Sequence, residues 1–203
     1  MPWLLTLDHV RRALRGHEAR TVEIADARPA AVALVLLDGP PSPPSPSATG
    51  LEILLIRRAE RADDPWSGQI AFPGGRYEPD DPDLLATAIR ETREETGVDL
   101  TSAERLGPLD DLYPRTPTLP PVVVRPFVFA LGRRPPPLVP SDEVQRAFWL
   151  PLSRLEETGV RREITLTLRG VERTFPAYLV DDELIWGMTE RILTPFIELV
   201  TNL

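Results

Sequence analysis

The chain has 203 residues, a formal net charge of −8 at pH 7 and a hydrophobic content of 42%, which is ordinary for a globular protein. It contains no cysteine, so thiol nucleophiles, disulfides and thiolate metal sites are excluded. The acidic balance argues against a nucleic-acid-binding scaffold, which normally has a basic patch, and we expect one globular domain over residues 1–203.

The first half of the chain shows one helix pattern and two strand patterns. An amphipathic helix is predicted at about residues 5–15, and apolar strands are predicted at 31–37 and 51–57. Residues 39–50 are rich in Pro, Ser and Gly and predict a loop between the strands. No apolar run approaches the roughly 20 residues that span a bilayer, and the N-terminus lacks a signal-peptide pattern. We therefore expect a cytoplasmic protein with no membrane partner.

The segment 74–97 predicts a helix with a start and a stop signal. Asp81 can cap the helix, and Pro82 suits the first helical position. Gly97 predicts the end, because glycine adopts the left-handed conformation after a helix without steric cost. An inward stripe at three- and four-residue steps is formed by Leu84, Leu85, Ala88, Ile89 and Thr92.

Three carboxylates share one face near the end of this helix. Glu91, Glu94 and Glu95 lie beside the apolar stripe, and we expect them to converge on a small volume. The helix dipole disfavours each anion here by roughly 0.3–1 kcal/mol, so a bound cation would offset the repulsion. Alternatively, this is a solvated acidic face tempered by the arginines of the helix. The paired glycines of the preceding loop, 72–75, favour the cation, because backbone oxygens can approach it closely, and hard oxygen ligands suit Mg²⁺ or Mn²⁺.

The second half of the chain predicts strands near 122–131 and 147–150, joined by a Pro-rich connection. The alternation on either side of Gly170 predicts a hairpin over 163–180. A final helix is predicted at about 188–200, and Pro195 should kink it or make it begin again. The hairpin and the N-terminal helix are the surfaces where we would expect a homodimer to form.

The loop and helix together resemble the Nudix box. Its pattern is a glycine, five residues, a glutamate and seven residues, followed by arginine-glutamate-aliphatic-any-glutamate-glutamate-any-glycine-aliphatic. The matching residues are Gly75, Arg90, Glu91, Glu94, Glu95, Gly97 and Val98. The chain departs from the pattern in having one extra residue between Gly75 and Arg90, with Asp81 or Asp83 where the first glutamate belongs, and Thr92 where the pattern has an aliphatic residue.

The resemblance implies an α/β fold, a Nudix-type alpha/beta/alpha sandwich with a central mixed sheet, and hydrolysis of a nucleoside diphosphate linked to another group. It also implies that Arg90 orients a glutamate, that Glu91 and Glu95 bind the metal, and that Glu94 acts in catalysis or as a further ligand. The Gly74 carbonyl is a plausible backbone ligand.

Hydrolysis of a pyrophosphate also requires a base, and the box offers no obvious candidate once metal occupies it. Asp142 and Glu143 lie in a loop before a predicted strand, and they could equally be a turn and helix-cap acid pair. Glu143 is the better candidate, because Nudix enzymes often have an acidic residue in this loop.

The segment before the box resembles the coenzyme A pyrophosphatase branch of the family. An arginine-bearing strand at 54–58 leads into Gly68-Gln69 and then Phe72-Pro73-Gly74-Gly75. Segments at 109–112, 149–152 and 185–189 also look like that branch, whereas 59–66 is more acidic than the branch usually is. Candidate substrate-binding residues are Arg57, Arg58, Arg61 and Trp66. The arginines could instead be exposed strand-end charges, and Trp66 could simply close a loop.

Three functions are consistent with these residues. The first is metal-dependent hydrolysis of the pyrophosphate bond of coenzyme A or a related nucleotide, giving 3',5'-ADP and 4'-phosphopantetheine from coenzyme A. The second is a broader hydrolase acting on ADP-ribose, dinucleotides or nucleoside triphosphates. The third is a noncatalytic nucleotide-binding module, although such a module could lose the mutually repelling glutamates and gain stability.

Overall fold

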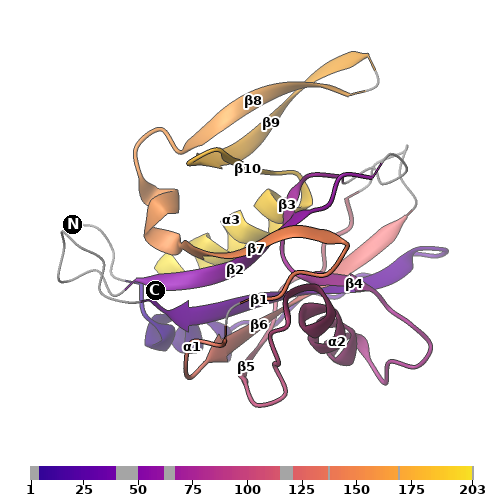
Figure 1. Ribbon diagram of the computed structural model, residues 1–203, viewed down its shortest axis with the longest axis vertical. Coiled ribbons are helices and arrows are strands. Elements are labelled where there is room, and N and C mark those ends of the chain that lie inside the picture. The colour runs from indigo at the N-terminus through magenta and orange to yellow at the C-terminus, as the bar shows by residue number, and fades with distance from the viewer. Residues whose placement is uncertain are drawn as a thin grey trace.

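A computed structural model describes residues 5–39, 50–61, 67–114, 121–136, 138–168 and 170–202. Most of the loop predicted at 39–50, and Trp66, therefore lie outside the described residues. The helices are α1 (Leu7–Arg15), α2 (Leu84–Thr96) and α3 (Met188–Thr201), with a 3-10 helix, η1 (Leu152–Glu156) (Figure 1). The strands are β1 (Arg28–Asp38), β2 (Leu51–Arg58), β3 (Ile70–Ala71), β4 (Gly74–Arg76), β5 (Glu104–Pro108), β6 (Val122–Leu131), β7 (Val144–Pro151), β8 (Arg161–Leu168), β9 (Val171–Val180) and β10 (Glu183–Trp186).

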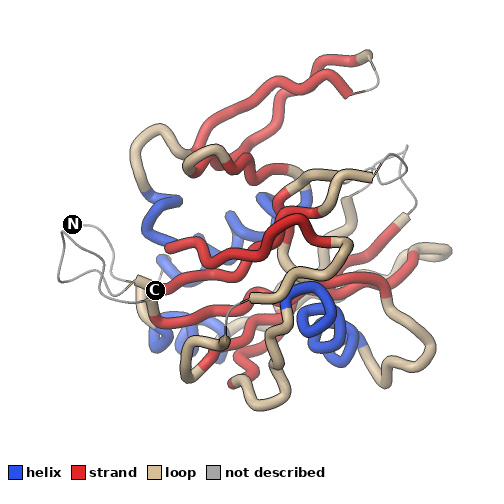
Figure 2. Tube along the Cα trace, viewed as in Figure 1, coloured by secondary structure: helices blue, strands red, loops and turns tan. Residues whose placement is uncertain are grey.

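The main sheet is mixed and separates two apolar cores. It has the strand order β3-β2-β1-β6-β5, with β4 also paired to β1 and β7 to β2. Among the described strands, only β1 and β6 run parallel. Leu34 and Leu36 point into the core shared with α1 and α3, whereas Ala33 and Val35 point into the core under α2. Helices therefore cover both sides of the strands (Figure 2), and the predicted alpha/beta/alpha sandwich is confirmed.

The central strands β1 and β2 pair over only part of their length. They are in register from Leu36 opposite Ile53 to Asp38 opposite Leu51, and farther along, β1 pairs with β4 and β2 with β3. The chain from β3 to β4 thus crosses from one central strand to the other, and the Ala33 amide donates to the Pro73 carbonyl at 2.9 Å. This crossing places the glycine loop directly against α2.

The C-terminal end of α2 is the one predicted from the sequence, whereas its N-terminal cap is a different residue from the one predicted. Gly97 ends the helix in the left-handed conformation, with φ of 75°, as predicted. The cap, however, is Asp83, which accepts the Ala86 amide at 2.8 Å, and not Asp81. Asp81 is buried and faces the helix side, where it binds Arg90.

The C-terminal helix also differs from expectation. The structure has one helix, α3, that continues through Pro195, so of the two predicted outcomes, a kink or a restart, the restart is wrong. Leu193 and Phe196 on either side of the proline are buried in the core, and this packing compensates for the backbone hydrogen bond that proline cannot make. The hairpin over 163–180 is confirmed as β8 and β9. Among the described helices, none has the length and apolar character needed to cross a membrane.

Candidate active site

Arg90 is fixed by a buried aspartate. Its Nε and Nη2 atoms donate to the two carboxylate oxygens of Asp81 at 2.9 and 3.0 Å. The same carboxylate accepts the Thr87 hydroxyl at 2.8 Å and the Glu78 amide at 3.1 Å. Hydrogen bonds from Arg90 hold the pKa of Asp81 well below its usual range. Of the two aspartates considered for the first glutamate of the motif, Asp81 is therefore the one that contacts Arg90, whereas Asp83 caps the helix.

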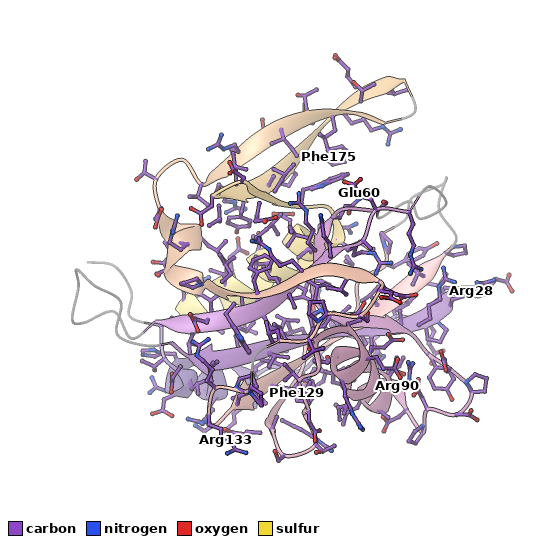
Figure 3. All side chains as sticks on the ribbon, in the orientation of Figure 1. Arg28, Glu60, Arg90, Phe129, Arg133 and Phe175 are labelled. Atoms are coloured by element: carbon purple, nitrogen blue, oxygen red, sulfur yellow. The ribbon has the colours of Figure 1, made fainter. Side chains whose placement is uncertain are left out.

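The remaining Nη1 atom of Arg90 points to the glutamates of its own helix. It donates to Glu91 Oε1 at 3.0 Å and to Glu94 Oε2 at 3.1 Å. Arg90 is labelled beside α2 in Figure 3. The arginine thus contacts the glutamate that the motif would have it orient, and the orienting role itself stays a prediction.

Glu91 lies directly against the second glycine of the loop. A β-carbon on Gly75 would come within 2.3 Å of Glu91 Oε1, so any side chain at that position would displace the carboxylate. Gly74 is equally constrained, because it has φ of 152° and its β-carbon would be 2.3 Å from the Ala31 carbonyl oxygen. The paired glycines are needed for close packing of strand, loop and helix.

Glu95 is a buried carboxylate beside the same loop. Only 4% of the residue is exposed, and Oε2 accepts the Gly74 amide at 2.8 Å. Burial raises its pKa to about 8, and the neighbouring Glu91 contributes to the rise. Burial also raises the pKa of Glu91. Both carboxylates therefore lie where burial disfavours the ionised form, and a bound cation would offset that cost.

The three glutamates do not converge as predicted. The Glu94 side chain is 59% exposed and turns to Arg90, while Glu95 points inward to the glycine loop. Within the described ranges, no group of three or more His, Cys, Asp or Glu side chains is arranged to hold a metal ion. The expectation of a three-carboxylate cluster is therefore wrong. Residues that share one face of a helix can still differ in how deeply their side chains are buried.

The Gly74 amide has a role that the sequence did not indicate. It donates to Glu95 and so positions a candidate metal ligand. The carbonyl's role as a ligand stays a prediction.

A loop far along the chain is docked on the C-terminal end of α2. The Val139 amide donates to the Thr96 carbonyl at 3.0 Å, and the Ser141 amide donates to the Glu95 carbonyl at 3.4 Å. These amides satisfy carbonyls that a helix end leaves without partners. The docking places Glu143 near the buried glutamate, where its negative charge also raises the pKa of Glu95.

Glu143 is held by the end of β2. Its carbonyl accepts the Ala59 amide at 2.9 Å, and its carboxylate pairs with Arg61 Nη1 at 3.1 Å. The side chain of Glu143 remains 59% exposed, so it can reach solvent. The structure thus brings Glu143 and Arg61 to the same region as Glu95.

The candidate substrate-binding arginines lie on different faces of the sheet. Arg58 approaches Glu95, with 4.0 Å between Nη1 and Oε1. Arg57, the preceding residue, points to the opposite face, where its Nη1 is 3.6 Å from Glu183 Oε2 and where Arg146 also contacts Glu183. Successive strand residues alternate in direction, so the structure brings Arg58 but not Arg57 to the glutamates.

The chemistry of Glu91 and Glu95 fits a small divalent cation. Mg²⁺ keeps several waters and is commonly held by one or two carboxylates together with substrate phosphates, so two glutamates suffice. The poorly compensated burial of Glu95 supports this assignment, since a cation would supply the missing positive charge.

Comparisons with known proteins agree with the geometry. The sequence-family model of the NUDIX domain matches residues 27–169 of this chain. The human protein named mitochondrial coenzyme A diphosphatase NUDT8 is 35% identical over 192 residues, which cover 92% of this chain and 74% of the human one. An uncharacterized Nudix hydrolase, NudL of Yersinia pestis strain Pestoides F, is 29% identical over 141 residues, covering 70% of this chain and 68% of NudL.

Solved structures agree on the fold. A MutT/nudix family protein from Enterococcus faecalis superposes with a TM-score of 0.57 at 22% identity, covering 97% of this chain and 70% of that one. A bifunctional NMN adenylyltransferase/ADP ribose pyrophosphatase from Francisella tularensis was solved in a complex with AMP and a manganese ion. It superposes with a TM-score of 0.55 at 16% identity, covering 96% of this chain and 46% of that one. With the matched domain, the fixed arginine and the paired glutamates, the chain belongs to the Nudix hydrolase family and is a pyrophosphohydrolase.

Proposed function

We propose that the protein hydrolyses the pyrophosphate bond of coenzyme A with Mg²⁺ or Mn²⁺, by attack of water on phosphorus. The observation that supports pyrophosphate chemistry most directly is the pair Glu91 and Glu95, which both lie against the glycine loop. Arg90 donates a hydrogen bond to Glu91, and the Gly74 amide donates one to Glu95. The choice of coenzyme A is supported by the 35% identity to the human diphosphatase over 92% of the chain.

Glu91 and Glu95 would hold the cation, which when bound would neutralise phosphate charge and lower the pKa of water. Arg90 keeps the Glu91 carboxylate in place, and Asp81 keeps Arg90 in place. The Gly74 amide does the same for Glu95. Because each ligand is oriented by a group behind it, the site is largely formed before substrate binds.

Glu143 is the proposed general base, and Glu94 has a lesser role. Glu143 is partly exposed, lies near Glu95 and is fixed through its backbone by Ala59. A base must reach the attacking water, and an exposed carboxylate beside the metal ligands satisfies that requirement. The alternative is that the Glu143–Arg61 contact only ties the loop to β2. Glu94, which contacts Arg90 in the exposed region, would help to orient that arginine.

Arg58 and Arg61 are the proposed phosphate-binding residues. Both lie on the side of the glutamates, and a guanidinium matches the geometry of phosphate oxygens. Arg57 is left out of this set, because it faces Glu183 on the other side of the sheet. The proposed role of Trp66 rests on the sequence alone.

The test is product analysis by chromatography in Mg²⁺ or Mn²⁺, over coenzyme A, acyl-coenzyme A, ADP-ribose, NADH, diadenosine polyphosphates and nucleoside triphosphates. Selective formation of 3',5'-ADP and 4'-phosphopantetheine would support the proposal. Preference for another compound would identify the broader hydrolase, which the acidic sequence of 59–66 favours over a dedicated coenzyme A enzyme. No metal-dependent turnover of any compound would favour a binding module.

Three expectations about the protein as a whole stay predictions. They are the single domain over residues 1–203, the cytoplasmic location and the absence of nucleic-acid and membrane partners. The human relative is mitochondrial by name, so location is best tested by imaging or fractionating the tagged chain in its own cells.

A further inference from the structure

Two arginines share one carboxylate on the side of the main sheet away from α2. Arg57 in β2 and Arg146 in β7 are directly opposite each other in the register of the two strands, so both side chains point to the same side. Glu183 in β10 contacts both. Its Oε2 is 3.6 Å from Arg57 Nη1, and its Oε1 accepts a hydrogen bond from Arg146 Nη2. In Figure 1, β10 lies on the side of β2 and β7 away from α2. We call these three residues the Glu183 cluster.

The Glu183 cluster has more positive charge than its single carboxylate balances. Like charges that face each other directly on neighbouring strands destabilise a sheet, and one carboxylate between two guanidiniums leaves one positive charge in excess. Other arginines of this acidic chain are better compensated, since Arg11 and Arg154 each pair with two carboxylates. Asp181, two residues before Glu183, pairs with Arg154 and does not supply the missing charge. The cluster is therefore suited to an added anion.

Hydrogen-bonding groups of the cluster are also left without partners. Within the described ranges, the Arg57 guanidinium makes no hydrogen bond, because its nearest approach to Glu183 is longer than one. Arg146 uses its Nη2 atom for Glu183, and its other guanidinium donors have no partner among the described residues. Glu183 Oε2 is buried and accepts no hydrogen bond. A fitting ligand would thus offer several acceptors to the arginines and one donor to the glutamate.

The donors are held in place and are open to solvent. The Arg146 guanidinium lies over the Phe148 ring, 4.5 Å from its centroid, which fixes the plane of the donors. The Arg57 backbone is paired on both sides, with Ile70 of β3 and Arg146 of β7. The Arg57 and Arg146 side chains are 39% and 54% exposed, whereas Glu183 is 12% exposed. A small molecule can therefore reach both guanidiniums, with the carboxylate lying deeper.

We propose that the Glu183 cluster binds a phosphate monoester that has a hydroxyl group beside the phosphate. The phosphate oxygens would accept from both arginines, because guanidinium forks match phosphate geometry, and the hydroxyl would donate to Glu183 Oε2. Both guanidiniums contact the same carboxylate, so their donors lie within roughly 8 Å of each other, and one phosphate with ordinary hydrogen bonds can bridge that gap. The alternative is that the cluster only fastens β10 to the main sheet, a role for which one arginine suffices.

This site is separate from the glutamates of α2. Arg57 and Arg58 point to opposite faces of β2, and β3 and β7 flank β2 at Arg57, so a ligand cannot pass through the sheet from one face to the other. The ligand chemistry has two sources. One is a free sugar phosphate, and the other is a nucleotide with a 3'-phosphate beside its 2'-hydroxyl, such as the 3',5'-ADP expected from coenzyme A. Binding at the cluster does not require the proposed hydrolysis to be correct.

The experiment is isothermal titration calorimetry of the protein in metal-free buffer with 3'-AMP, 2'-deoxy-3'-AMP, glycerol 3-phosphate and inorganic phosphate. Without metal, the carboxylates of α2 repel phosphate, so binding there is disfavoured. Wild type should bind 3'-AMP with a Kd on the order of 0.1–1 mM, and the deoxy compound roughly fivefold more weakly. Arg57→Gln and Arg146→Gln should each weaken 3'-AMP binding at least about tenfold. Each variant keeps one arginine to pair with Glu183, so the contact with β10 is retained.

Arg134→Gln is the matched control. Arg134 is also a half-exposed arginine near an aromatic ring, Trp149, and it pairs with Glu52, but among the described residues it has that carboxylate to itself. The variant should bind 3'-AMP as wild type does. Glu183→Gln removes the competing negative charge and should tighten binding of inorganic phosphate about threefold or more, which a purely structural contact would not do.

Glycerol 3-phosphate separates the two sources, because it has the phosphate and the neighbouring hydroxyl without a base. Affinity equal to that of 3'-AMP would support the site with a sugar phosphate as ligand, and tighter binding of 3'-AMP would support it with a nucleotide. Circular dichroism checks that each variant is folded before titration.

Several results would overturn the proposal. They are no binding of 3'-AMP by wild type, equal weakening in Arg134→Gln, and binding that Arg58→Gln abolishes but Arg57→Gln leaves intact, which would place the nucleotide on the face of α2. Equal affinities for 3'-AMP and its deoxy counterpart would refute the contact between the hydroxyl and Glu183. No turnover is measured, so failure here would leave the proposed hydrolase standing.

Discussion

Replacing Asp81 by asparagine should destabilise the protein and disorganise the site, because Asp81 is the buried partner of Arg90. Its carboxylate is 6% exposed and accepts two hydrogen bonds from Arg90, one from Thr87 and one from Glu78. Breaking a buried ion pair costs about 3–5 kcal/mol. Arg90 is one-quarter exposed and retains its contacts with the helix glutamates, so we discount the loss to about 2–3 kcal/mol. For a chain of this size the midpoint of thermal unfolding should fall by about 4–12 °C.

The stabilisation that Asp81 provides should be lost as the pH falls. The folded-state pKa of Asp81 is depressed by Arg90, so its stabilising contribution is complete above the unfolded value, near pH 4, and is lost as the pH falls through the folded value. The difference in unfolding free energy between wild type and Asp81→Asn should therefore be constant near pH 7 and shrink below about pH 4. Denaturant unfolding monitored by circular dichroism at several pH values measures it.

The matched control is Asp83→Asn, two residues away. Asp83 caps α2 through the Ala86 amide, and asparagine is an equally good cap, so the change should cost under about 0.5 kcal/mol. Equal midpoints for Asp81→Asn and Asp83→Asn, or an Asp81→Asn effect that persists unchanged at pH 3, would refute the assignment of a buried Asp81–Arg90 pair.

Four further substitutions, two of them with matched controls, test the site. Glu91→Gln and Glu95→Gln should each reduce metal-dependent turnover at least about 100-fold with the fold intact. At pH 7, Glu95→Gln should also stabilise the metal-free protein by about 1 kcal/mol, because burial raises the pKa of Glu95 and its carboxylate must take up a proton on folding, whereas glutamine is already neutral. Unchanged turnover in both variants would contradict the ligand assignment. Gly75→Ala should lower turnover at least about tenfold by displacing the Glu91 carboxylate, whereas Gly132→Ala, where no atom lies within 4 Å of the added carbon, should leave activity as in wild type. Glu143→Gln should lower kcat about 10²–10⁴-fold if Glu143 is the base, while its neighbour Asp142→Asn changes little; equal kinetics of the two variants would exclude that role.

The helix at the centre of the site could be predicted from the sequence, because the residues that start, stop and pattern a helix act locally. Gly97 stops α2 as predicted, since its left-handed conformation depends on the backbone of one residue. The arginine and glutamates of the motif stand at fixed helical spacing, so their order on one element follows from periodicity alone. The hairpin could be predicted for the same reason. The family and the sandwich were instead implied by the resemblance to the Nudix box.

The cap and the role of Asp81 were not readable, because two aspartates in the same stretch can both satisfy a helix start. Asp83 became the cap, and Asp81 became buried against Arg90 once the chain was packed. The depths of the three glutamates likewise depend on the glycine loop that lies over α2. A pattern of residue types gives the direction of each side chain, but its burial depends on neighbours from other elements.

The partners of Arg57 and Arg58, and the position of Glu143 near the site, also depend on tertiary structure. Adjacent strand residues face opposite sides, and only the packing of α2 on one side and β10 on the other gives each arginine its partner. Glu143 lies 48 positions after Glu95 in the chain, yet the loop before it hydrogen-bonds to the end of α2. Local backbone preferences and side-chain periodicity thus specify the elements and the motif, whereas contacts between residues distant in sequence set the burial, charge partners and geometry of the site.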